Sequence, residues 1–153
     1  MDVVRILDAC ISHALATGLF SSVSGHDPKS KNPAVGPDLT AAMWVQDIGP
    51  VPLASGLAAT SGRLELTLRI YTSMLAEPQD SIDPNVLGAV DTMLAAYSGD
   101  FELGGAVRNV DLLGAAGRGL SAKAGYLNQA GKLFRVMDIC LPLVISDIWS
   151  QHA

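Results

Sequence analysis

The sequence predicts an α+β domain: an antiparallel β-sheet of about four to five strands packed with two α-helices, with long loops between the early strands. Residues 2–17 and 83–99 have apolar side chains at helical spacing. Residues 39–48 and 63–75 instead alternate apolar and polar side chains, as a half-buried strand does. Since 153 residues is close to the commonest domain size, residues 1–153 are expected to form a single domain.

The first helix is predicted over residues 2–17. Asp2 is a suitable N-cap, and Gly18 is a suitable stop after the last turn. The apolar positions recur every three or four residues, at Val3, Leu7, Cys10, Ile11 and Ala14. The segment is therefore expected to be amphipathic and to place one face on the sheet.

Residues 20–38 are predicted to form a long irregular connection, because repeated Gly and Pro interrupt any regular element. A strand follows over residues 39–48. Its more apolar face holds Leu39, Ala41, Met43 and Val45, and its more polar face holds Thr40, Ala42, Trp44 and Gln46.

A second irregular stretch, residues 49–62, leads to the strand over residues 63–75. One face of that strand carries Leu64, Leu66, Leu68 and Ile70, and the other carries Glu65, Thr67, Arg69 and Tyr71. The two strands are expected to pair antiparallel, with a broad tip between them.

The second helix is predicted to begin with Asp83 as N-cap and Pro84 at its first position, and to end at Gly99. Its apolar face is expected to consist of Leu87, Val90, Leu94 and Tyr97.

The last third of the chain predicts further strands. The segment VRNVDLLG sets Val110 and Leu112 against Asn109 and Asp111, and residues 114–125 are expected to be a flexible loop. A hairpin turn is predicted at 128–131, before a long strand over 132–145. That strand is apolar on both faces, with Met137, Ile139 and Leu141 on one and Phe134, Val136 and Cys140 on the other. A strand of this kind is buried on both sides.

Two arrangements of the helices fit this order of elements. If both helices pack on one face of the sheet, the opposite face keeps Trp44, Tyr71, Phe134 and Val136 in need of a cover, which a partner subunit could supply. If the helices instead divide between the two faces, a monomer closes its own core.

Composition and charge limit the function. Only 16% of the residues are charged, against roughly 25% in a usual soluble domain. This low share indicates that part of the surface becomes covered. A coding bias toward Ala and Gly explains part of the excess of uncharged residues equally well. The formal net charge of −5 argues against a broad basic surface for nucleic acid. Cys10 and Cys140 are expected to be two buried thiols in a reducing cytoplasm. The run ICLPLVISDIW is too short to span a bilayer, so no membrane partner is expected.

No set of residues predicts an enzyme, a cofactor site or a metal site. His13, His26 and His152 each stand without an acid or a nucleophile at a useful spacing, and no GxSxG segment occurs. The segment GAAGRG, residues 114–119, lacks the GK[ST] ending of a phosphate-binding loop and is expected to be a mobile hairpin tip. Glu77, Asp80 and Asp83 are expected to favour the start of the second helix rather than to bind calcium.

Two segments carry a family resemblance. The segment RIYTSMLAEPQDSIDPNVLGAVDTMLAAYSGDFELGGAVRNVDLLG and the later AGYLNQAGKLFRVMDICLPLVISDIW resemble the tail terminator proteins of long-tailed phages, especially those of actinobacteria, over roughly residues 63–149. The resemblance implies a small α+β subunit that forms a ring, commonly of six copies, at the head-proximal end of the tail tube. Such a ring ends polymerisation of the tube protein and gives the head connector a docking face. It implies a virion protein assembled in the host cytoplasm, with no cofactor and with DNA only passing through the ring.

If the resemblance holds, the polar face of the strand over 63–75 is expected to form a seam between subunits, where charged side chains pair and fix the angular register. The expected interface residues are Trp44, Glu65, Arg69, Tyr71, Arg108, Asp111, Phe134, Arg135 and Asp138. The alternative is that the charged members are solvated on an exposed sheet face, where each contributes little.

Two other functions fit the sequence. A head-side neck or stopper protein also forms a ring at the junction of head and tail, and a small cytosolic ligand-binding module would use the two long loops as its site. The ligand-binding module predicts a concave pocket with convergent polar groups, whereas a ring subunit predicts flat lateral faces without such a pocket.

Overall fold

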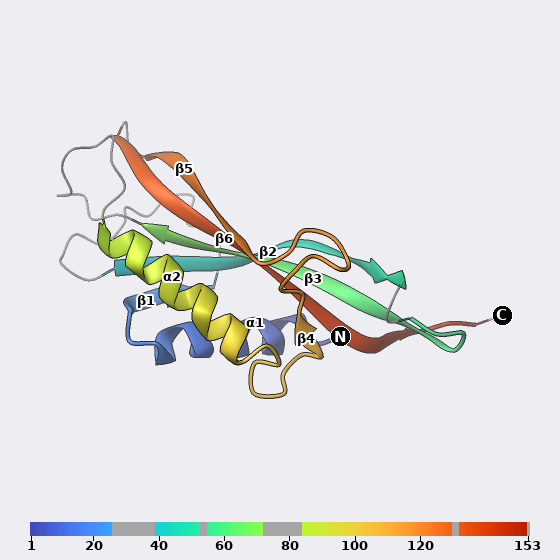
Figure 1. The fold of residues 1–153 in the computed structure, drawn as a ribbon. Coiled ribbons are helices and arrows are strands. Elements are labelled where there is room, and N and C mark those ends of the chain that lie inside the picture. Colours follow the sequence, from blue (N-terminus) through green and yellow to red (C-terminus); the bar gives the residue numbers. More distant parts are fainter. Residues whose placement is uncertain (26–38, 53–54, 72–83, 130–131, 153) are drawn as a thin grey trace.

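The computed structural model describes residues 1–25, 39–52, 55–71, 84–129 and 132–152, without the side chains of residue 85 and of residues 128–135. The two helices are α1 (Val3–Ala16) and α2 (Pro84–Gly99). The strands are β1 (Phe20–Ser24), β2 (Leu39–Val51), β3 (Ala59–Tyr71), β4 (Asn109–Val110), β5 (Ser121–Gln129) and β6 (Lys132–Ser150). Together they form a mixed, curled six-stranded sheet with helices beside it, which confirms the α+β class (Figure 1).

The sheet is built around the long antiparallel pairs β2–β3 and β3–β6. The other edge of β6 is shared, because its first half pairs with β5 and its second half with β4. β1 pairs parallel with β2 at the opposite edge of the sheet. The sheet thus has six strands rather than four to five, and it is mixed rather than purely antiparallel.

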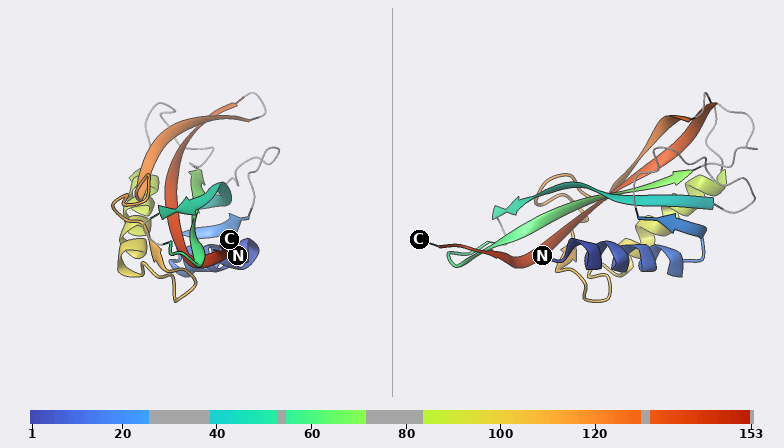
Figure 2. Two further views of the ribbon diagram at one scale, coloured as in Figure 1. Left: turned by 90° about the vertical axis from the view of Figure 1, so that its right-hand side faces the viewer. Right: turned by 180° about the vertical axis from the view of Figure 1, so that it is seen from behind.

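Both helices lie on one face of the sheet (Figure 2). A single core cluster contains the buried side chains of α1, of α2 and of the helix-side face of β3. Leu64, Leu66, Leu68 and Ile70 of β3 are all fully buried there. The first of the two expected helix arrangements is therefore the one observed, and apolar burial on this face is the main source of stability.

Helix α1 forms as its sequence predicts. The Asp2 carboxylate accepts a hydrogen bond from the backbone N–H of Arg5, and Gly18 follows the helix with a φ of 74°. Ile6, Cys10 and Ala14 are the buried positions, and Ile6 was not among those expected. The other apolar positions pack on the core cluster at its margin.

Helix α2 has the expected bounds but a different buried face. Its buried residues are Val86, Ala89, Val90, Met93 and Tyr97, whereas Leu87 is 47% exposed. The expectation for Leu87 is wrong because the inward stripe is centred on Val90 and Met93, and Leu87 lies outside that stripe. The expected N-cap, Asp83, lies outside the described residues, as do Glu77, Asp80, His26 and residues 72–75.

Three segments expected to be irregular are partly strand. Residues 20–24 form β1, whose Phe20 is buried in the core cluster. The β2–β3 connection is shorter than 49–62, because β2 runs to Val51 and β3 starts at Ala59. Residues 121–125 belong to β5, where Ala122 and Ala124 pack on the core. Small side chains give a weak strand signal, so pairing with β6 decides the structure there.

Strand β6 is buried on both faces over its middle, as predicted, and it extends to Ser150. Met137, Ile139 and Leu141 lie in the core cluster on the helix side. Val136 and Cys140 are buried on the other side, where Val136 joins a small cluster with Ala42 and Tyr71. The predicted position Phe134 is paired in this strand, but its side chain lies outside the described residues.

The core assignment predicts a large effect of Leu66→Ala. Because Leu66 is fully buried, the substitution should lower the free energy of unfolding by about 2 to 5 kcal/mol. The matched control is Leu57→Ala, since Leu57 is 99% exposed and its change should stay within about 0.5 kcal/mol. Urea unfolding followed by circular dichroism measures both, and equal losses would contradict the assignment.

Candidate functional site

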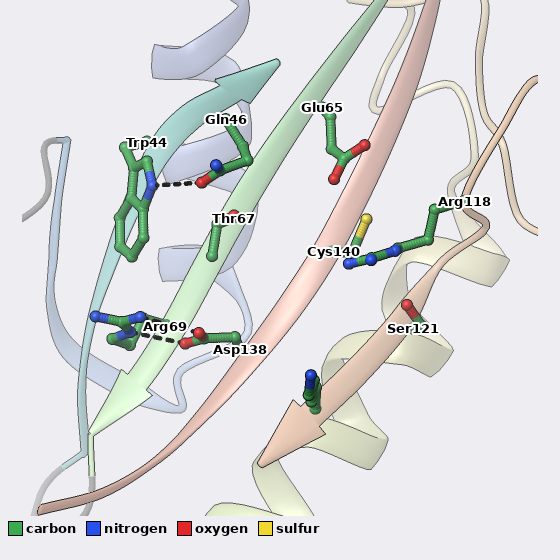
Figure 3. A pocket seen from close by; sticks show the side chains of 10 residues that line it. Trp44, Gln46, Glu65, Thr67, Arg69, Arg118, Ser121, Asp138 and Cys140 are labelled. Carbon is green, nitrogen blue, oxygen red and sulfur yellow. Dashed lines mark hydrogen bonds and ion pairs between the residues drawn. The ribbon is translucent and has the colours of Figure 1, made fainter. Parts of the chain in front are cut away.

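The helix-free face of the sheet contains a groove of about 530 Å³. The sheet curls so that β5 and β6 rise over this face and leave it concave (Figure 2). Side chains from β2, β3, β5 and β6 converge there (Figure 3). The lining residues are Trp44, Gln46, Glu65, Thr67, Arg69, Arg118, Ser121, Lys123, Asp138 and Cys140.

Cross-strand register builds the groove in rows. One row runs across the sheet through Trp44, Thr67, Cys140 and Ser121, which are successive partners on β2, β3, β6 and β5. The next row runs through Ala42, Arg69, Asp138 and Lys123. Side chains directly opposite each other point to the same face, so four strands contribute to one surface.

Arg69, one of the lining residues, has several contacts within the chain. Its Nε donates to Asp138 Oδ1 at 2.7 Å, and its Nη2 donates to Asp138 Oδ2 at 3.0 Å. The guanidinium also lies over the Trp44 ring, 5.1 Å from the centroid, as in a cation–π contact. Trp44 Nε1 in turn donates to Gln46 Oε1 at 3.2 Å. These contacts fix the groove floor within one chain.

A second ion pair connects the groove to the loop before β5. Arg63 Nη1 lies 2.6 Å from Glu65 Oε2, with side chains only 11% and 15% exposed. Arg63 Nη2 also donates to the backbone carbonyl of Arg118 at 2.7 Å. The loop that carries Arg118 is thereby attached to β3.

Asp111 organises that loop from inside. Its carboxylate accepts hydrogen bonds from the backbone N–H groups of Gly114, Ala115 and Ala116 at 3.1, 2.8 and 2.9 Å. Gly114 has a φ of 83°, and a Cβ there would lie 2.6 Å from the carbonyl oxygen of Gly117. The N–H groups that could cradle a phosphate are thus used by the chain's own carboxylate, and the segment forms a turn between β4 and β5.

Glu65 and Cys140 influence each other at the groove. Burial raises the pKa of Glu65, but hydrogen bonds from Arg63 and Cys140 and the charges of Arg63 and Arg118 outweigh it and leave that pKa lowered. Burial, then the charge of Glu65 and its hydrogen bond, raises the pKa of the Cys140 thiol to about 11. Cys10, on the buried face of α1, has a pKa raised to about 12 by burial. Both thiols are therefore protonated near neutral pH.

Most of the expected interface residues lie on the helix-free face. Trp44, Glu65, Arg69 and Asp138 line the groove. Tyr71 is buried in the small cluster beside it. Arg108 lies at the β4 end, where its Nη1 donates to Ser146 Oγ at 3.2 Å. Arg135 of β6 stands opposite Tyr126 of β5. The side chains of Arg135 and Phe134 lie outside the described residues.

Asp111 is the exception among these residues. It was expected in the seam between subunits or, in the alternative, solvated on an exposed sheet face, but it is only 4% exposed. The strand ends at Val110, and the chain then turns so that the carboxylate serves the loop's N–H groups. An Asp followed by a Gly-rich segment was the available signal for such a turn.

The prediction from the sequence did not include the cations at one wall of the groove. Arg118 and Lys123 lie in a segment expected to be loop, so nothing placed them beside β3 and β6. Within the described part of the chain, neither one forms an ion pair with a carboxylate. The groove therefore combines two internally neutralised pairs with two cations that can receive an anionic group.

On the helix side of the sheet, the described residue His13 contributes to packing. His13 stacks on Tyr97 at 5.2 Å on the helix side of the sheet, with its Nε2 3.8 Å from Asp100 Oδ2, and so serves helix packing. Among the described residues, no group of three or more His, Cys, Asp or Glu side chains could hold a metal ion. Over the same residues, neither helix has the length and apolar character needed to cross a bilayer.

Comparison with known proteins adds no assignment. No family model matches the chain, and no curated protein matches it.

Asp111→Ala should destabilise the protein, because three N–H groups lose a charged acceptor. We expect a loss of about 2 to 3 kcal/mol in the free energy of unfolding. The matched control is Asp91→Ala on the exposed side of α2, where the change should be within about 0.5 kcal/mol. Chemical denaturation measures both, and a neutral Asp111→Ala would contradict the turn described.

Glu65→Gln should make Cys140 more reactive. Removing the carboxylate removes a negative charge that disfavours the thiolate, so the pKa of Cys140 should fall from about 11. The rate of iodoacetamide labelling, measured from pH 7 to 10 in a Cys10→Ser background, should rise at each pH below that value. Cys10, followed in a Cys140→Ser background, should not respond, because burial alone raises its pKa. Unchanged labelling of Cys140 would refute the coupling.

Proposed function

We propose that the chain is a structural assembly subunit of a phage tail, acting as a tail terminator. The observation that carries the proposal is that both helices cover one face of the sheet, while the other face is concave and uncovered by any described helix (Figures 1 and 2). A two-layer domain with one open sheet face has a natural docking surface for a neighbour. The resemblance of residues 63–149 to tail terminators gives the proposal its specific form.

The projecting ends of the strands support the same proposal. The β2–β3 hairpin and the carboxyl end of β6 extend beyond the helices at one end of the molecule (Figure 1). Large apolar side chains are exposed on these segments, with Ile48 at 46%, Leu57 at 99% and Trp149 at 37%. Exposed apolar side chains on an extended arm suit a contact that becomes buried in an assembly. We propose that this end meets the tube protein or the head connector.

The charge of the chain is compatible with a ring through which DNA passes. A net charge of −5 gives no broad basic surface that would retain phosphates by counterion release. The ring proposal therefore needs no DNA-binding site, only a bore that DNA crosses.

The groove itself favours a second candidate, a ligand-binding module. A concave site with convergent polar groups was the feature expected of that class, and the expected flat lateral face is not what the sheet presents. A curved face also suits a subunit that receives a convex neighbour. A ligand-binding module should bind a small anion as a monomer, whereas a ring subunit should bind copies of itself or the tail tube.

Capping of tail tubes tests the proposed function. Purified tube protein should form tubes of uncontrolled length, and adding this chain during polymerisation should shorten them and place a ring at one end, as seen by negative-stain electron microscopy. In a lysate lacking the chain, tails of uncontrolled length indicate a terminator. Normal-length tails detached from heads would instead indicate a neck protein. Tubes of unaltered length without end rings would contradict the proposal.

A further inference from the structure

We propose that the groove receives the helix layer of a second copy of this chain, so that subunits join front to back. The helix layer comprises α1, α2 and the turn at residues 100–107. This inference rests on the proposed function and names the two surfaces that would form the ring contact.

The groove is the cationic side of an acidic chain. Its lining holds the three cations Arg69, Arg118 and Lys123 against two carboxylates, a net charge of +1, although the whole chain carries −5. Arg69 is already paired with Asp138, whereas Arg118 and Lys123 form no ion pair with a carboxylate among the described residues, although Arg118 acts on the charge of Glu65 and Lys123 stands opposite Asp138 in the sheet. Lys123 lies on β5, and Arg118 lies in the loop before that strand. Figure 3 shows Arg118 on the β5 side of the groove.

The helix layer has the opposite charge. Counted together with Asp2, the N-cap of α1, it holds five carboxylates against one arginine, a net charge of −4, and α2 contains no basic residue. Two of these carboxylates are used internally, since Asp2 caps α1 and Asp100 accepts from the N–H of Gly104. Asp8, Asp91 and Glu102 are exposed and have no partner among the described residues.

The position of the two surfaces suits such a contact. The groove and the helix layer lie on opposite faces of one sheet, and the sheet curls into a concave surface on the groove side (Figure 2). A contact between different patches on identical copies is heterologous, and it closes into a ring when the rotation per copy is a simple fraction of a turn. Complementary charges then fix the orientation of each copy.

Other occupants fit less well. A duplex or single strand of DNA would bring phosphates against Glu65 and Asp138, which lie among the cations. A small apolar ligand would meet five charged side chains in the lining. A protein surface with a few carboxylates can pair with Arg118 and Lys123 and leave both internal ion pairs intact.

Site-directed crosslinking tests the contact. In a Cys140→Ser background, Lys123→Cys marks the groove, and Asp8→Cys and Asp91→Cys mark the helix layer. A bismaleimide crosslinker is applied to the free protein and to capped tubes. Lys123→Cys mixed with either helix-layer variant should give crosslinked dimers, and a chain that carries both changes should give a ladder of multimers. The control is Arg108→Cys at the β4 end, which should not link to either helix-layer variant.

Charge reversal gives the second measurement. The double variant Lys123→Glu with Arg118→Glu should weaken self-association, or the fraction of tube ends that carry a ring, at least about tenfold. Higher salt should also weaken the contact between copies of the unsubstituted protein, because salt screens the charges. Combining that variant with Asp8→Lys and Asp91→Lys in the partner copy should restore part of the loss. Light scattering and counting of end rings measure these effects.

The outcomes separate the inference from the proposed function. The inference is wrong if rings form on tubes but Lys123→Cys does not link to the helix layer. It is also wrong if the only links join two Lys123→Cys chains. In both cases the terminator function still stands. Binding of DNA or of a free carboxylate by a monomer, abolished by the same charge reversal, also overturns the inference. If the chain forms no multimers and caps no tubes, the inference and the proposed function are both wrong.

Discussion

The antiparallel pairing of β3 with β6 is the constraint on which the rest of the structure depends. Its register sets Leu64, Leu66 and Leu68 toward the helices and, on the other face, sets Arg69 opposite Asp138. A slip of one residue would exchange the two faces, burying the arginine under the helices and exposing the leucines. The apolar core and the ion pair therefore enforce the same alignment from opposite sides of the sheet.

The elements of the fold were predictable from the sequence where the pattern that defines them lies within a few neighbouring residues. Alternation over 39–48 and 63–75 and helical spacing in 2–17 and 83–99 identified the main elements, because periodicity is carried within a few residues. β1 and β5 were missed because each needs a long neighbouring strand to form. Leu87 was misplaced because several apolar residues of α2 could define its inward stripe, and only packing selects one.

The groove was less predictable than the fold. Glu65, Arg69 and Asp138 were expected on one face, but Arg69 and Asp138 are 69 residues apart, and the sequence did not show that they pair within one chain. Arg118 and Lys123 reach the groove only through the Asp111 turn and the β5–β6 pairing. Asp111 itself was expected in the subunit seam or on an exposed sheet face, since alternation says nothing about where a two-residue strand stops. The site thus depends on contacts that are distant in sequence.

Strand β6 also determines when the domain can form during synthesis. β3, β4 and β5 all pair with β6, and all three precede it in the chain. Until residues 132–150 have left the ribosome, β3 has only β2 as a strand partner, and β4 and β5 have no strand partner among the described elements. Domains dominated by such long-range pairing fold slowly. The nascent chain therefore carries an unpaired edge of β3 until the last strand emerges.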